Sequence, residues 1–204
     1  MLNPPKASKR LRNAWFNFNK NSTEQNISLV SFAYGFNSNK HSRSDVILFY
    51  YGEKVEDCPY TLDRILNDFI NEEWEKYHDF IQWLFPNTEP SQYNDKAPIL
   101  TEADIAIFKS NTMLQNTVDK SVFEFMRFLG FAICYDDATE YGVSIYQRYD
   151  SQLSTFNHNH LRITRMLKFL KAIGHWMLHP VFYTLDRACV VPTSRQYWKE
   201  VYNG

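Results

Sequence analysis

Apolar residues recur every three or four positions through most of the chain beyond residue 60, and this spacing gathers side chains on one face of an α-helix. In residues 61–74, a stripe of Leu, Ile and Phe is opposed by acidic residues. The pattern predicts an all-α fold, a single compact multi-helix domain. Its helices are expected over residues 61–74, 76–85, 101–109, 113–129, 158–173, 180–190 and 193–202.

Several helix ends carry local signals. Thr101 followed by Asp104 resembles a capping box, in which each residue satisfies a backbone N–H group of the other. Asn157 or Asn159 can cap the start of the helix that runs to about residue 173, and Gly174 can adopt the left-handed conformation that ends it.

Other stretches lack a clear helical period. The apolar run at residues 46–51, VILFYY, is expected to be a short buried strand or extended anchor. Residues 134–147 are expected to form a connecting loop, residues 147–156 a weaker helix, and residues 6–18 a short helix near the start of the chain.

The chain divides by composition into a basic, Asn/Ser-rich segment, residues 1–44, and a helical domain, residues 45–204. A chain of 204 residues buries about 70% of its unfolded surface, so this domain needs no disulfide or metal. The net charge is −1, yet residues 53–104 carry thirteen acidic residues against four basic ones, and residues 157–204 carry seven basic against two acidic. Two explanations of this charge segregation remain open. The acidic and basic segments pair with each other and form solvated faces, or they form oppositely charged surfaces that bind a partner.

The three cysteines form no CxxC pair, which argues against a disulfide framework or structural zinc and favours a reducing, intracellular compartment. No apolar run approaches the ~18–20 residues that span a bilayer, so the chain is expected to be soluble. His175 and His179 are spaced like helical metal ligands, but Gly174 and Pro180 interrupt a helix there. No metal site and no cofactor are expected.

Three motifs carry a resemblance to a known family. YHDFIQWLFP (residues 77–86), KAPILTEADIAIF (96–108) and HNHLRITRMLKFL (158–170) resemble, in order and spacing, the opioid growth factor receptor conserved domain. The similarity covers about residues 46–190. It implies an all-α domain and, in vertebrates, a receptor for the pentapeptide methionine-enkephalin that sits at the nucleus and restrains proliferation. The family pattern has histidine at Phe156 and asparagine at His160, so this chain departs from it there.

The third motif opens with the main group of candidate ligand-binding residues: His158, Asn159, His160, Arg162 and Arg165. The start of a helix attracts anions through its free N–H groups and the helix dipole. An anion or a ligand carboxylate could therefore dock there.

A structural role for the two arginines is the alternative. Bidentate pairing with the acidic segment, for instance with Glu72, Glu73 or Asp79, would hold helices together. We expect a mixed outcome, in which Arg165 is structural, and His158 and Arg162 are an exposed, ligand-facing pair.

In the first motif, His78 and Gln82 are neighbours on a helix face and are also candidate ligand-binding residues. Trp83 and Leu84 are expected in the core, because aromatic and aliphatic residues at helical spacing usually pack inside.

Three functions remain open. The first is binding of a peptide or protein partner, in which aromatic residues and the acidic segment receive a cationic, aromatic ligand. The second is nucleic-acid or phosphate binding through the basic residues. The third is an enzyme, although GxSxG, GxGxxG and phosphate-loop motifs are absent and no catalytic residue is assigned. An enzyme would bring His158 together with an acid of shifted pKa. The oligomeric state is left open.

Overall fold

The structure, a computed structural model, describes residues 43–92, 94–148 and 153–204. The chain divides into two units, Met1–Arg43 and Ser44–Gly204, and every helix and strand named below belongs to the second. The helix expected over residues 6–18 lies outside the described residues.

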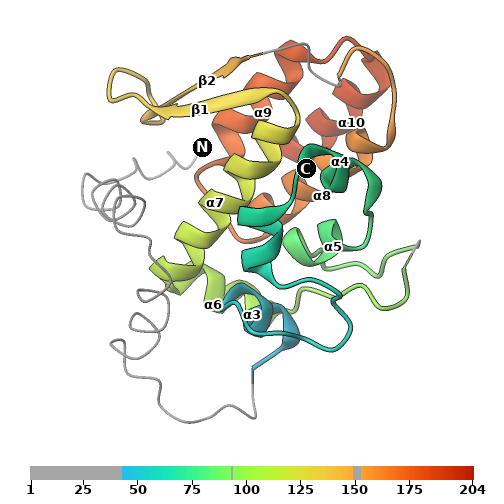
Figure 1. Cartoon of the computed structure of the whole chain (residues 1–204). Helices are drawn as coiled ribbons and strands as arrows, with labels where there is room; N and C mark the ends of the chain where they lie inside the picture. The colour runs from blue at the N-terminus through green and yellow to red at the C-terminus, as the bar shows by residue number, and fades with distance from the viewer. Residues whose placement is uncertain (1–42, 93, 149–152) are drawn as a thin grey trace. The chain divides into compact units, whose positions relative to one another are not determined.

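Helices make up most of the described chain, as the sequence predicted, and a two-stranded antiparallel sheet is added to them (Figure 1). No helix within the described ranges is both long enough and apolar enough to cross a membrane. In chain order the elements are α3 (Asp45–Tyr50), the π-helix η2 (Arg64–Asp68), α4 (Asn71–Lys76), α5 (Phe80–Leu84), α6 (Glu102–Ser110), α7 (Thr112–Phe128), β1 (Phe131–Tyr135), β2 (Val143–Gln147), α8 (His158–Ala172), α9 (Leu178–Ala188) and α10 (Pro192–Asn203).

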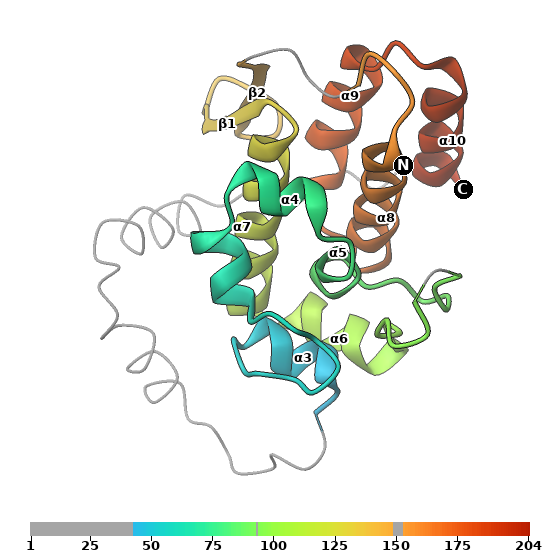
Figure 2. The ribbon, with the colours of Figure 1, turned by 45° about the vertical axis from the view of Figure 1, so that its right-hand side comes forward.

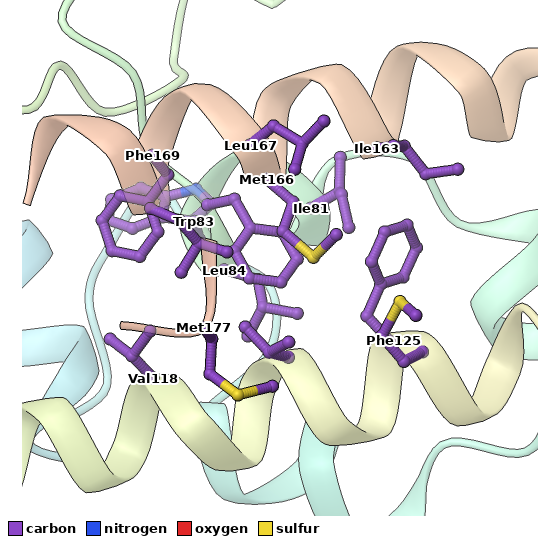
Figure 3. Packing of buried hydrophobic residues seen from close by; sticks show 14 of the residues in the cluster. Ile81, Trp83, Leu84, Val118, Phe125, Ile163, Met166, Leu167, Phe169 and Met177 are labelled. Carbon is purple, nitrogen blue, oxygen red and sulfur yellow. The ribbon is translucent and has the colours of Figure 1, made fainter. Parts of the chain in front are cut away.

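Two long helices organise the packing. Helix α7 packs against α6, η2 and β1, whereas α8 packs against α9 and α10, and Figure 2 shows this second group together. Between α7 and α8 lie buried side chains of the short helix α5, among them Ile81, Trp83 and Leu84 (Figure 3). The buried apolar residues of the unit form one continuous core. A short segment of the first sequence motif therefore joins the two long helices.

The predicted helix ends are largely confirmed. Thr101 and Asp104 form a capping box at the start of α6, and the Asn157 side chain accepts from the Asn159 N–H to cap α8. Gly174, with φ of +63°, follows α8 in the left-handed conformation that favours glycine. Helix α9 begins at Leu178, two residues before the expected start at Pro180.

Residues 46–51 are not extended, as we had expected, because Asp45–Tyr50 form helix α3. The Ser44 hydroxyl caps this helix by accepting a hydrogen bond from the Ile47 N–H at 3.3 Å. Four of its six residues are buried, so almost the whole circumference is apolar. A run that is apolar all round has no visible period, and so a short buried helix and a buried strand look alike in sequence.

The expected helix over residues 61–74 is broken in two. Phe69 and Ile70 have extended backbone angles between η2 and α4, and Ile70 is 59% exposed although it belongs to the predicted apolar stripe. The Glu73 carboxylate accepts from the Ile70 N–H at 3.1 Å and so caps the start of α4. This local bond, with the burial of Trp74, replaces the continuous helix.

The expected loop over residues 134–147 contains most of a β-hairpin. Strand β1 pairs with β2 in the register Phe131↔Gln147 to Tyr135↔Val143. The turn uses Gly142, whose φ is +72°. Residues 153–156, the described end of the weaker helix expected over residues 147–156, are not helical.

We predict that Trp83→Ala lowers the free energy of unfolding by about 3–5 kcal/mol, because it empties a large site in the core. Trp83 is 2% exposed, and its indole nitrogen has no hydrogen-bond partner among the described residues, so the loss comes from packing. Chemical denaturation measures the change. The control is Ile70→Ala at an exposed apolar site, which should change stability by less than about 0.5 kcal/mol. Equal stability of the two variants would show that Trp83 does not hold the core.

Candidate functional site

Arg162 is buried in the interior, and the expectation that it is exposed is wrong: its exposed fraction is 4%. Its guanidinium donates to the backbone carbonyls of Trp74 and Tyr77, both at 2.6 Å, and to the Asn159 side chain at 3.1 Å. It also donates to the Nδ1 atom of His78 at 2.9 Å. Arg162 therefore joins α8 to the connection between α4 and α5.

These carbonyls need donors for a structural reason. The last four carbonyls of any α-helix lack partners within it, and Trp74 lies in the last turn of the six-residue helix α4. A cation at the carboxyl end of a helix also interacts favourably with the helix dipole. Burial lowers the pKa of Arg162 to about 10, and the negative charge of Glu75 opposes this shift, so the guanidinium stays charged at neutral pH.

Three side chains form an exposed edge over Arg162: Glu75, His78 and His158, which we call the His–Glu edge. One Glu75 carboxylate oxygen lies 3.3 Å from Nε2 of His158, and the other accepts from the Asn159 amide at 3.3 Å. The rings of His78 and His158 meet edge to face, with their centroids 5.2 Å apart. The side chains of Glu75 and His158 are 46% and 37% exposed, and His78 is also exposed.

The charge state of His158 follows from this arrangement. Burial lowers its pKa below the usual 6.5, the positive charge of Arg162 and the neighbouring His78 add to the effect, and Glu75 opposes it. His158 is therefore neutral at pH 7. The edge presents one carboxylate and two imidazoles, and Arg162, which we had expected to be exposed, is buried.

Three other candidates, Asn159, His160 and Gln82, are buried. Asn159 is fully buried, and His160 is 2% exposed, with Nδ1 at 2.6 Å from the Ser194 hydroxyl of α10. Gln82 is 8% exposed and bonds to Ser91 and Asn94 in the following loop. The structure therefore brings His78, His158, Asn159 and Arg162 together, and it leaves His160, Gln82 and Arg165 outside this group.

Arg165 is half-buried and donates to the Phe85 carbonyl at 3.3 Å, and burial lowers its pKa. It thus contacts the α5 end, as a structural role requires. The acidic partners that we had considered are not the ones used, because in the described residues both arginines bond to backbone carbonyls, and Glu73 pairs with Arg64 at 3.0 Å.

The described residues hold no group of three or more His, Cys, Asp or Glu side chains arranged for a metal. His175 and His179 diverge: the first accepts from the Met177 N–H, and the second bonds to the Tyr202 hydroxyl at 2.6 Å.

Sequence reasoning missed Glu75. Within the acidic run NEEWEK nothing distinguishes it from Glu72 and Glu73, and only its contacts with His158 and Asn159, more than 80 positions later, single it out.

We predict that Arg162→Ala destabilises the protein by roughly 2–6 kcal/mol, because the buried Trp74 carbonyl and the partly buried Tyr77 carbonyl lose their donor at about 1–3 kcal/mol each. Lys168→Ala on the same helix is the control, since Lys168 only pairs with an exposed Glu89 at 3.2 Å, and its loss should cost less than about 1 kcal/mol. Denaturation curves of both variants decide the matter. Arg162 is not the joint described above if the two midpoints coincide.

Comparison with known proteins places these residues in a family. Residues 38–194 match the profile described as "Opioid growth factor receptor (OGFr) conserved region", a stretch that contains the whole His–Glu edge. The chain is similar to the opioid growth factor receptors of Homo sapiens, Mus musculus and Rattus norvegicus, with 36%, 34% and 32% identity over 131, 131 and 130 residues.

Each alignment covers 60% of this chain but only 19%, 20% and 22% of the human, mouse and rat receptors, so the matched region is about a fifth of those proteins. No solved structure matches the chain significantly. The family profile spans more than half of the chain and agrees with the three motifs quoted above. The chain therefore belongs to the opioid growth factor receptor conserved-region family.

Proposed function

We propose that this domain binds a peptide or protein ligand and that the His–Glu edge contacts that ligand. The observation that carries the proposal is the fixed, exposed group of Glu75, His78 and His158 over a buried arginine. The similarity to proteins named opioid growth factor receptor supports a receptor-like role. Because the chain matches only part of those proteins, the whole receptor's activity is part of the proposal.

The edge has the chemistry that recognises peptide groups. Arg162 can only donate, so Nδ1 of His78 accepts, and the hydrogen of the neutral ring is on Nε2. His78 thus offers a donor on the same edge as the Glu75 carboxylate, an acceptor, with the His158 ring in contact with both. A donor and an acceptor on one edge complement a peptide carbonyl and an N–H group or terminal ammonium.

The edge is also held in place before any ligand arrives. Arg162 fixes the backbone at Trp74 and Tyr77, and these residues flank Glu75 and precede His78. A site that is ordered in advance loses less conformational entropy on binding.

Aromatic surface lies next to the edge in the chain. The rings of Tyr60 and Tyr77 stack at 5.3 Å, and both residues are half-buried. Burial is the main cause that raises the pKa of Tyr60; the positive charge of Arg64 opposes it, and the negative charges of Asp79 and Glu73 add to it. The stacked rings favour a ligand with an aromatic ring, and the two carboxylates favour one that also carries positive charge.

The phosphate-binding alternative has less support in the described part of the chain. Arg162 and Arg165 turn inward, and Lys171 donates to the Val201 carbonyl at 2.7 Å. Lys168 pairs with Glu89. These four basic side chains of α8 are therefore engaged in contacts within the domain.

We predict that Glu75→Gln weakens binding of methionine-enkephalin, the ligand implied by the family resemblance, at least tenfold, with little change in melting temperature. The charge lost is exposed, so it contributes to the ligand more than to stability. Isothermal titration calorimetry at pH 7.5 measures the affinity.

The matched control is Glu72→Gln, which removes an exposed charge from the first turn of the same helix and should change affinity less than twofold. If both substitutions weakened binding equally, the effect would come from the overall negative charge of the helix and not from a contact with Glu75. Absence of binding by the unsubstituted chain would refute this ligand.

A further inference from the structure

A second pair of ionisable side chains is buried away from the His–Glu edge. Asp119 of α7 and His175, in the turn between α8 and α9, are 7% and 2% exposed. Oδ1 of Asp119 lies 3.6 Å from Nε2 of His175. The proposed peptide site uses neither residue.

The hydrogen bonds of His175 define its protonation. Its Nδ1 atom accepts from the Met177 N–H at 3.4 Å, so the hydrogen is on Nε2, which points to the Gln115 carbonyl at 3.3 Å. A second proton, on Nδ1, would face the Met177 N–H and break that bond. The neutral ring thus links α7 to the turn before α9.

The groups around Asp119 come from three elements. The Trp176 side chain hydrogen-bonds to it from the turn. Burial raises the pKa of Tyr135 in β1, and the charge of the nearby Asp119 adds to this shift. The adjacent cation on α7, Lys120, interacts with Asp63 and Glu124. Burial raises the pKa of Asp119 to about 8 and lowers that of His175 to about 4.

We propose that Asp119 and His175 form a pH-sensitive latch, which holds the turn between α8 and α9 against α7 while both side chains are uncharged and loosens when Asp119 loses its proton. An ionised carboxylate in this interior has a strong need for water, and admitting water requires the turn to move from α7. The device does not depend on ligand binding at the His–Glu edge.

Linkage gives the pH window. Asp119 holds its proton in the folded chain up to about pH 8 but loses it near 3.8 when unfolded, so this group reduces stability as the pH rises from 3.8 to 8. In the folded chain His175 has a pKa of about 4, whereas in the unfolded chain its pKa is near 6.5. This group therefore increases stability as the pH rises from about 4 to 6.5. The two effects cancel below pH 6.5. Between 6.5 and 8 the unfolding equilibrium constant should increase roughly eightfold, because the Asp119 effect of up to about tenfold per pH unit levels off near pH 8 and unfolded His175 is still losing its proton just above pH 6.5.

Each single substitution should therefore change the pH dependence of stability, and each should do so over its own pH range. In Asp119→Asn, the increase of the unfolding constant between pH 6.5 and 8 should disappear. In His175→Gln, stability should instead fall continuously from pH 4 to 8. The double variant serves as the control and should lack both contributions. Denaturant titrations at steps of half a pH unit give the unfolding constants. If the unfolding constants of both single variants changed with pH in the same way as those of the parent, the proposal would be overturned.

Measurements on the unsubstituted chain test the same point if a variant does not fold. The carboxyl carbon of Asp119 should titrate near pH 8 by NMR, together with the indole N–H signal of Trp176. Hydrogen exchange of the Met177 amide, corrected for its intrinsic pH dependence, should quicken over the same range. Titration of Asp119 near pH 4, or Met177 protection that is constant from pH 6.5 to 9, would overturn the latch.

Discussion

The guanidinium of Arg162 and the carbonyls at the end of α4 depend on one another. A charged group that leaves water without partners is very costly, and so are backbone carbonyls that leave water without donors. Arg162 and the carbonyls of Trp74 and Tyr77 remove both costs at once. A helix of six residues is too short to be stable alone, so α4 relies on this contact and on the packing of Trp74 against Phe125 and Phe128. The position of the His–Glu edge follows from it.

The sequence predicted the long helices well, because helices α7 and α8 each carry a buried apolar stripe beside mostly polar residues that are only partly buried, which is the arrangement that hydrophobic periodicity detects. It was wrong about α3, where burial on nearly all sides removes the period, and about the hairpin, whose strands are five residues long and only partly buried. The break at Phe69 and Ile70 depends on a Glu73 cap that competes with a continuous helix. A cap of this kind is hard to recognise from the sequence, because the same residues also fit a continuous helix.

The candidate site was predicted less completely than the fold, and the reason is distance along the chain. His78, His158, Asn159 and Arg162 were singled out from motifs, but the acceptor of Arg162 at Trp74 lies 88 positions away. Amino-acid type shows that an arginine needs acceptors without showing which backbone will supply them. The same limit explains why Asp119 was not expected beside His175, since Asp119 lies within one predicted helix, His175 follows the end of another, and only the packing of α7 against the turn before α9 brings them together.

The acceptors of Arg162 at Trp74 and Tyr77 are main-chain atoms, which every amino acid carries. These main-chain bonds between α8 and the α4–α5 connection do not depend on the side chain at position 75, whereas at position 78 the His78 ring also accepts from Arg162. Position 75 can therefore carry another side chain while the scaffold that presents it is preserved. Proteins that share this scaffold can therefore differ in the residues that contact a ligand. They can bind different ligands without a change of fold.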